Sequence, residues 1–216
     1  MGPHRTAVVF AGGDPPRPGL SELVPDDAVV IAADGGHDHA LALGITTDRI
    51  VGDLDSADLA AVTTAVAAGT ELEEHPRDKD ATDLELAVLS AMELGVEEVI
   101  VIGGHGGRMD HFLANALVLT KPEFAPMRIR AYFGDALVTV VHTDATITGR
   151  IGEVCSLLAL GSTATGVSTT GLRFALDGGA LHPGSTLGMS NELTDEIATV
   201  RIASGTLLVV QPKWRS

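Results

Sequence analysis

The chain has 216 residues, of which 45% are hydrophobic and 20% are charged, and its formal net charge at pH 7 is -15. No stretch approaches the roughly 18 uninterrupted apolar residues that a membrane helix needs, so we expect a soluble protein without a membrane partner. Nucleic-acid binding depends on neutralisation of phosphates by Lys and Arg, of which there are only 14, so the composition also argues against a nucleic-acid partner.

The first 135 residues alternate short apolar runs with segments of helical spacing. The runs that resemble buried parallel strands are Thr6 to Phe10, Asp27 to Ala32, Arg49 to Val51, Val99 to Ile102 and Met127 to Phe133. Helical spacing or helix-favouring composition marks residues 57–68, 84–92 and 112–119. This alternation predicts an α/β domain over residues 1–135, with a mostly parallel, doubly wound sheet.

From about Ala136 helical periodicity fades, and short β-favouring runs alternate with turn signals such as Pro183-Gly184. The runs are residues 137–141, 154–160, 197–202 and 207–210. This pattern predicts a second, all-β domain over residues 136–216, in the form of a sandwich. No long flexible linker separates the two predicted domains, so we expect them to pack.

The cysteine content and the N-terminal sequence favour a reducing compartment. Cys155 is the only cysteine, so no intrachain disulfide can form. Met1 to Ala11 lack the longer apolar region and the small-residue cleavage site of a signal peptide. We therefore expect a cytoplasmic protein.

Acidic residues and glycines gather where the predicted strands end, which is where open α/β sheets bind their ligands. The segments concerned are Ala33 to Gly36, Gly52 to Ser56 and Gly103 to His111, and a fourth cluster, Arg77 to Asp83, opens the helix predicted near residue 80. The sequence therefore predicts a ligand site at one edge of the sheet.

The first acidic pair is Asp53 and Asp55. In an extended segment the side-chain period of two would point both carboxylates the same way, so that they could hold one hard cation such as Mg²⁺. The alternative is that Asp55 and Ser56 only begin the next helix, with Ser56 as its N-cap.

The second acidic pair is Asp80 and Asp83, which would share one face at a helix start. Helix capping by Asp80 is again the alternative. Lys79 weakens that alternative, because it is a lysine among charged residues at a predicted ligand edge, where it could meet a phosphate.

Four glycines in five residues, from Gly103 to Gly107, directly follow a predicted strand, and Arg108 follows at a helix start. Such a loop lets the backbone approach an anion, while amides and the Arg side chain donate hydrogen bonds. The loop matches neither a Walker A motif nor a complete dinucleotide fingerprint, and no histidine or cysteine pattern indicates zinc. These features favour a site that binds Mg²⁺ and a phosphate-containing ligand.

Taken together and in this order, the clusters resemble the thiamine pyrophosphokinase family. The matching pieces are Ala33 to Gly36, Gly52 to Ser56, Lys79 to Glu85, Gly103 to His111 with Asn115, Thr170 to Phe174, and Gly188 to Glu192. The resemblance covers nearly the whole chain. It implies an α/β catalytic domain followed by a β-sandwich, transfer of diphosphate from ATP to the hydroxyl of thiamine with release of AMP, and a homodimer that binds thiamine between subunits.

The resemblance also implies roles for individual residues. Asp53, Asp55 and Asp83 would hold Mg²⁺ and phosphates. Asp110 would serve the transfer chemistry together with these three, and the residues expected around ATP are Asp34, Gly35, Gly36, Lys79, Thr82, Gly104 and Arg108. Ser190 and Asn191 would contact the thiamine pyrimidine. Some members of the family place a tryptophan near that Ser-Asn pair, whereas the only tryptophan of this sequence is Trp214.

Two other functions remain open at this point. One is a related Mg²⁺-dependent pyrophosphokinase that acts on a different alcohol, such as a pterin. The other is a non-catalytic nucleotide-binding module that contacts a partner protein through its β domain.

Overall fold

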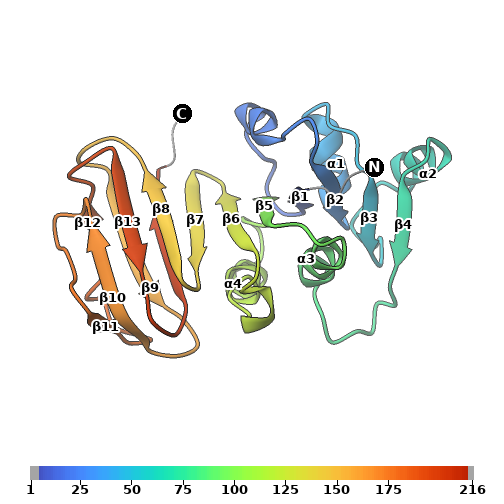
Figure 1. Cartoon of the computed structure of the whole chain (residues 1–216). Helices are drawn as coiled ribbons and strands as arrows, with labels where there is room; N and C mark the ends of the chain where they lie inside the picture. The colour runs from blue at the N-terminus through green and yellow to red at the C-terminus, as the bar shows by residue number, and fades with distance from the viewer. Residues whose placement is uncertain (1–4, 214–216) are drawn as a thin grey trace. The chain divides into compact units, whose positions relative to one another are not determined.

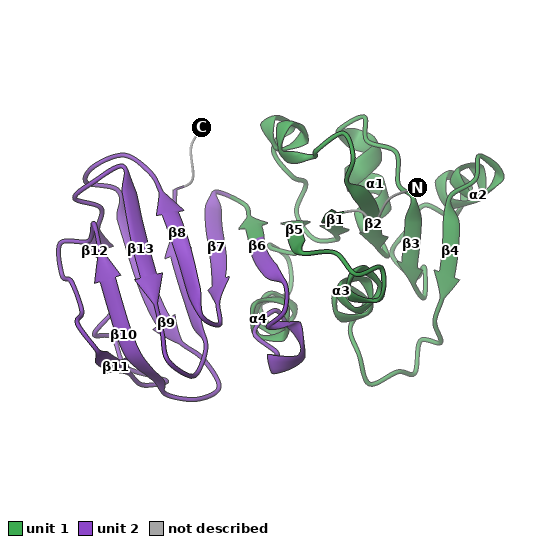
Figure 2. Cartoon of the chain, in the orientation of Figure 1, with its two compact units in different colours: residues 1–118, 131–134 green, residues 119–130, 135–216 purple. Residues whose placement is uncertain are grey.

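The structure, a computed structural model, describes residues 5–213, so Trp214 lies outside the described residues. The chain forms two compact units, one of residues 1–118 and 131–134 and the other of residues 119–130 and 135–216 (Figure 2). Within the described part of the chain, no helix has the length and apolar character needed to cross a membrane.

A parallel sheet forms the centre of the first unit. Its strands are β1 (Thr6–Ala11), β2 (Val29–Ala33), β3 (Arg49–Gly52), β4 (Glu71–Glu74) and β5 (Glu98–Gly103). They lie in the order β5-β1-β2-β3-β4, and every neighbouring pair is parallel. Residues 7–10 of the central strand β1 are fully buried, as expected for an apolar run that is covered on both faces.

Helices fill the connections between these strands (Figure 1). They are α1 (Gly36–Ala42), α2 (Leu59–Ala67), α3 (Asp83–Glu93) and α4 (Met109–Val118), and a short 3-10 helix, η1 (Pro18–Leu23), follows β1. Strand β6 (Arg128–Phe133) begins in the second unit and ends in the first. The predicted alternation of strands and helices is therefore confirmed.

Strand β4 was not predicted, because three of its four residues are glutamates and no apolar run marks it. It lies at the edge of the sheet beside β3. Arg49 of β3 ties it in place, since the Nε and Nη2 atoms of Arg49 lie 3.0 and 2.6 Å from Oε2 of Glu71. Its Nη1 also donates to Oγ of Ser90 in α3, at 2.6 Å.

The second unit is antiparallel. Its elements are η2 (Pro122–Phe124), β7 (Ala136–Val141), β8 (Asp144–Thr148), β9 (Val154–Ala159), β10 (Ala164–Thr170), β11 (Gly179–Leu181), β12 (Asn191–Glu192), β13 (Ile197–Arg201) and β14 (Leu207–Gln211). One group of strands has the order β7-β14-β9-β12 and the other β11-β10-β13-β8, with antiparallel pairs in both. Side chains from both groups, among them Leu157 and Val200, share one buried core. The predicted all-β part of the chain is thus confirmed.

Cys155 of β9 is fully buried in this core. Burial raises the pKa of its thiol from 9.0 to about 11, so the reactive thiolate is scarce near neutral pH. We expect a thiol-specific reagent at about pH 8 to label the native protein at least about 100-fold more slowly than the urea-unfolded protein. Rapid labelling of the native protein, followed by mass spectrometry, would contradict the burial of this side chain.

Candidate functional site

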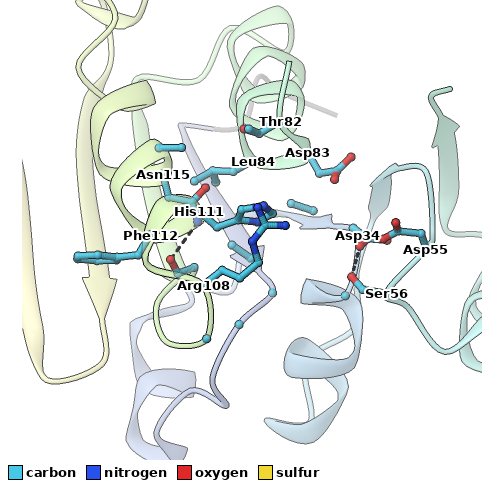
Figure 3. Close-up of a pocket in the computed structure, with 18 of the residues that line it drawn as sticks. Asp34, Asp55, Ser56, Thr82, Asp83, Leu84, Arg108, His111, Phe112 and Asn115 are labelled. Carbon is cyan, nitrogen blue, oxygen red and sulfur yellow. Dashed lines mark hydrogen bonds between the residues drawn. The ribbon is translucent and has the colours of Figure 1, made fainter. Parts of the chain in front are cut away.

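A cavity of about 730 Å³ opens at the carboxyl ends of β1, β2, β3 and β5, and all of its lining residues belong to the first unit. The predicted site residues in its lining are Asp34, Gly35, Asp53, Asp55, Lys79, Thr82, Asp83, Gly104 and Arg108. Figure 3 shows Asp34, Asp55 and Ser56 on one side of the cavity, and Arg108, which precedes α4, and His111 of α4 on the other. The edge of the sheet at which the sequence predicts a ligand site therefore forms a cavity.

Three carboxylates converge in this cavity. One oxygen each from Asp34, Asp53 and Asp83 lie within 4.8 Å of one another. Asp34 follows β2, is only 7% exposed and has a left-handed backbone with φ of 47°. Its Oδ2 accepts a hydrogen bond from the Ser56 hydroxyl, whereas its Oδ1 is buried without a hydrogen-bond partner.

Burial raises the pKa of the Asp34 carboxyl, and the charges of Asp83 and Asp55 add to this effect against the hydrogen bonds from Ser56 and the Gly35 amide. A buried carboxylate oxygen without a donor, close to two further acids, carries an uncompensated electrostatic cost. A bound cation would remove that cost.

The geometry predicted for Asp53 and Asp55 is wrong, because the segment between them is not extended. Leu54 has a φ of 61°, in the left-handed region, so the two side chains do not follow a period of two. Asp34 completes the three-carboxylate cluster in place of Asp55. The Asp55 carboxylate instead accepts two hydrogen bonds from Arg77, at 2.5 and 3.1 Å.

Lys79 lies within the acidic cluster. Its Nζ is 3.1 Å from Oδ2 of Asp53 and 2.8 Å from Oδ1 of Asp83, and the Lys79 side chain is 13% exposed. Burial lowers the pKa of Lys79, but its bonds to the two acids outweigh burial and leave the pKa raised. For Asp53 the effects have the opposite signs. Burial raises its pKa, but the hydrogen bond and charge of Lys79 are among the contributions that leave the pKa below its ordinary value. Lys79 therefore remains a cation and Asp53 an anion at neutral pH.

Helix capping does not account for the acids of this site. Helix α3 begins at Asp83, and the Thr82 hydroxyl caps it by accepting from the Glu85 amide at 3.2 Å. Asp80 lies before the helix, so the expectation that Asp80 and Asp83 share a face at the helix start is wrong. Helix α2 is capped by Asp58 and not by Ser56, whose hydroxyl instead reaches Asp34.

The glycine-rich loop after β5 is locked to the loop after β1. The Gly104 amide donates to the Gly12 carbonyl and the Asp14 amide to the His105 carbonyl, each at 2.8 Å. Gly13 has a φ of 109°, and a Cβ there would lie 2.2 Å from the backbone carbonyl oxygen of His105, so this close approach of the two loops requires glycine. The loop therefore presents a fixed backbone to the cavity.

Arg108 and Asp110 form an exposed pair at the start of α4. Nη2 of Arg108 lies 2.6 Å from Oδ2 of Asp110. The hydrogen bond from Arg108 lowers the pKa of Asp110 to about 2, so Asp110 is ionised at neutral pH. Arg108 lines the cavity, whereas Asp110 and Gly36 lie outside the lining that the described residues form.

Ser190 and Asn191, the predicted thiamine contacts, belong to the second unit. Ser190 is exposed and has a left-handed φ of 54°, and its amide donates to Oγ of Ser156 at 3.0 Å. Asn191 is only 5% exposed, so most of its side chain is not available to a ligand.

Several cavity residues were missed from the sequence. They are Ala11, Gly12, Gly13, Phe112 and Ala114. The pair Gly12-Gly13 directly after an apolar run is a signal that could have been used, because the same rule of strand ends applies to it. His37 and His39 of α1 do not line the cavity, and their Nδ1 atoms form hydrogen bonds with Thr47 Oγ1 and the Ala11 carbonyl.

Models of two protein domains match this sequence. The model of the thiamin pyrophosphokinase catalytic domain matches residues 20–131. The model of the thiamin pyrophosphokinase vitamin B1 binding domain matches residues 140–207. The two matches follow one another along the chain and together cover most of it.

Two named proteins illustrate the sequence similarity. Thiamine pyrophosphokinase 1 of Oryza sativa subsp. japonica is 31% identical over 176 aligned positions, and the alignment covers 75% of this chain but only 64% of the rice protein. Thiamine pyrophosphokinase of Bacillus subtilis is 27% identical over 217 aligned positions, which cover 96% of this chain and 98% of the relative.

Solved structures have the same fold. The crystal structure of the Bacillus subtilis thiamine pyrophosphokinase superposes with a TM-score of 0.83 at 24% identity and covers 97% of this chain and all of its own. Thiamin pyrophosphokinase from Candida albicans superposes with a TM-score of 0.76 at 14% identity, with 95% of this chain and 89% of that chain covered. At these sequence identities the superpositions show only that the fold is shared.

Proposed function

Because the chain belongs to the thiamin pyrophosphokinase family of enzymes, we propose that it transfers a diphosphate group from ATP to the hydroxyl of thiamine. The products are thiamine diphosphate and AMP, so the enzyme serves thiamine diphosphate biosynthesis. The observation that carries this proposal is the convergence of three carboxylates, a lysine and a rigid glycine loop in one cavity. Phosphoryl-type transfer needs such positioning and charge neutralisation more than it needs a nucleophilic side chain.

The acids of the cavity fit a Mg²⁺ ion. Carboxylate oxygens of Asp34, Asp53 and Asp83 are close enough to share one cation, oxygen is the donor that Mg²⁺ prefers, and the buried Oδ1 of Asp34 lacks a donor. Asp55, which we predicted as a ligand, would act beside these three. When bound, the ion would neutralise phosphate charge and orient the transferred group.

The remaining cavity residues suit the phosphates of ATP. Lys79 carries a positive charge among the acids, and the exposed guanidinium of Arg108, which is paired with Asp110, can donate hydrogen bonds to a phosphate. We assign Gly104 and the neighbouring loop amides to phosphate contacts, and Gly35, Gly36 and Thr82 to the nucleotide side of the site. Asp110 would orient Arg108.

We propose a division of labour along the chain. Residues 1–135, with a mostly parallel, doubly wound sheet, would bind Mg²⁺-ATP, and residues 136–216, as a β-sandwich, would bind thiamine through the segment around Ser190 and Asn191. The two family-model matches, at residues 20–131 and 140–207, support this division.

We further propose a cytoplasmic homodimer, as the resemblance to the family implies. Sedimentation should then give a mass of twice the 22.2 kDa of one chain. The chain's single cysteine agrees with a reducing compartment.

The function is tested by incubating the protein with ATP, Mg²⁺ and thiamine and identifying the products by mass spectrometry. We expect AMP and thiamine diphosphate in equal amounts, because the thiamine hydroxyl attacks the β-phosphorus and the bond to the α–β bridging oxygen breaks. ADP with thiamine monophosphate would contradict the proposal. A parallel reaction with a hydroxymethyl pterin tests the alternative acceptor, and the absence of AMP with every acceptor would leave a non-catalytic nucleotide-binding module.

A further inference from the structure

The first unit contains a second cavity, of about 470 Å³. Its walls come from α1, from α2 and from the short segments that precede β3 and β4. We call it the α1–α2 pocket. Among the described residues none lines both this pocket and the acidic cavity, so a molecule in one would not occupy the other.

The walls of the α1–α2 pocket are mostly apolar. Leu41 of α1 lines it and is 47% exposed. Threonine hydroxyls in the wall are engaged within the protein, since Thr64 Oγ1 donates to the Ala60 carbonyl at 2.9 Å and Thr70 Oγ1 to the Thr47 carbonyl at 2.8 Å. The alanines of the wall are Ala60, Ala61, Ala65 and Ala68. Such a wall suits the apolar body of a small molecule.

His37 of α1 adds one polar group to this pocket. The side chain is fully buried and lines the pocket. Its Nδ1 lies 3.1 Å from Oγ1 of Thr47, whereas its Nε2 is buried and has no hydrogen-bond partner among the described residues. Buried polar atoms in native proteins are rarely left without a partner. The missing partner of Nε2 therefore points to a ligand or a water molecule.

Thr47 indicates which ring nitrogen of His37 carries hydrogen. Thr47 is only 2% exposed, and within the described part of the chain its hydroxyl bonds to His37 alone. If the hydroxyl donates to Nδ1, the hydroxyl is satisfied and the ring hydrogen lies on Nε2. The other tautomer would bury the hydroxyl hydrogen without an acceptor, which is costly. Nε2 is therefore a buried donor that lacks an acceptor.

We propose that the α1–α2 pocket is a second ligand site, which binds a small uncharged molecule with an apolar body and one carbonyl oxygen. The carbonyl oxygen accepts a hydrogen bond from Nε2 of His37. A charged ligand does not fit, because alanine and leucine walls leave a charge uncompensated. Asp58, which also lines the pocket, would repel an anion, and its Oδ1 is already engaged with the Ala60 amide at 2.9 Å.

Camphor, an uncharged bicyclic ketone, is the probe for this site. Titrated into ¹⁵N-labelled protein, it should bind with a Kd of about 1 mM or lower, as expected for a ligand of this size. The amide signals of Leu41, Thr47 and Ala61 should shift saturably, and those of Gly104 and Arg108 should not. Saturating Mg²⁺-ATP should leave camphor bound. Displacement by ATP would place camphor in the acidic cavity and would overturn the proposal.

Two variants test the contacts. His37→Phe keeps a ring but removes the donor, so we expect it to weaken camphor binding by about fivefold or more. Ala60→Leu reduces the space in the pocket from an exposed position, and should weaken binding by a similar factor even if His37→Phe fails to fold. Ala67→Leu is the matched control, because Ala67 is exposed in the same helix but does not line the pocket. Its Kd should stay within about twofold of the wild-type value, as for other surface changes.

Two further results would overturn the proposal. If the signals show no saturable shift up to the solubility limit of camphor, the pocket holds water only, and a water molecule satisfies Nε2 of His37. If Ala60→Leu and every folded His37→Phe preparation bind camphor as tightly as Ala67→Leu does, camphor binds elsewhere on the protein. Circular dichroism spectra show which variants are folded.

Discussion

Replacement of Asp53 or Asp83 by asparagine is expected to lower kcat by at least about 100-fold while leaving the protein folded. Both carboxylates belong to the three-acid cluster, and both bond to Lys79. Asparagine keeps the size of the side chain but removes the negative charge, so the cation is held less tightly and Lys79 loses one partner. Steady-state rates of AMP formation measure the change in kcat, and circular dichroism spectra show whether each variant is folded.

Asp58→Asn is the matched control for these variants. Asp58 caps α2, where its Oδ1 accepts from the Ala60 amide at 2.9 Å, and asparagine caps a helix about as well as aspartate. This variant should keep both its turnover and its stability. If Asp53→Asn and Asp83→Asn behaved in the same way as Asp58→Asn, the cavity acids would be structural and the proposed metal site would be wrong.

A second large effect is expected from Gly36→Ala, this time on folding stability. A Cβ at Gly36 would lie 2.0 Å from the carbonyl oxygen of Phe10 and 2.5 Å from its carbonyl carbon. Phe10 is fully buried in β1, an interior strand of the sheet, so its backbone has no room to yield. Helix α1 must then move away from β1, which should cost about 3 kcal/mol of unfolding free energy, at the upper end for an overpacked core.

Urea unfolding followed by circular dichroism measures this loss. Gly19→Ala is the control, because a Cβ at Gly19 meets nothing within 4 Å, and surface changes of this kind usually stay within about 0.5 kcal/mol. Equal midpoints for the two variants would show that α1 does not depend on this close approach. Since Gly36 was predicted as an ATP-binding residue, KM for ATP in any folded fraction also tests that role.

The fold was predictable where burial leaves a pattern in the sequence. After their first residues, strands such as β1 and β5 are apolar because both of their faces are buried, and the runs that mark them were recognised within one or two residues. Strand β4 could not be recognised in this way, because an edge strand that faces solvent needs no apolar residues. The short strands β11 and β12 also lack a run long enough to stand out.

The sequence predicted where the candidate site lies but not how its side chains are arranged. The rule of strand ends located Asp34 and Asp53, the predicted helix start located Asp83, and all three line one cavity. The grouping of Asp34 with the other two depends on the left-handed backbone at Asp34 and Leu54, which a spacing rule based on extended chains does not contain. The engagement of Asn191 with the Phe174 backbone depends on contacts 17 residues apart along the chain, which no local pattern reveals.

The glutamates of β4 also have a consequence for behaviour at high concentration. Glu71, Glu73 and Glu74 stand on the strand that ends the order of the parallel sheet, where backbone groups on the open side lack a neighbouring strand. Two such edges from different molecules would bring their carboxylates together, and the repulsion opposes strand addition. The glutamates that prevent recognition of β4 from the sequence therefore also oppose the formation of intermolecular sheets and fibrils.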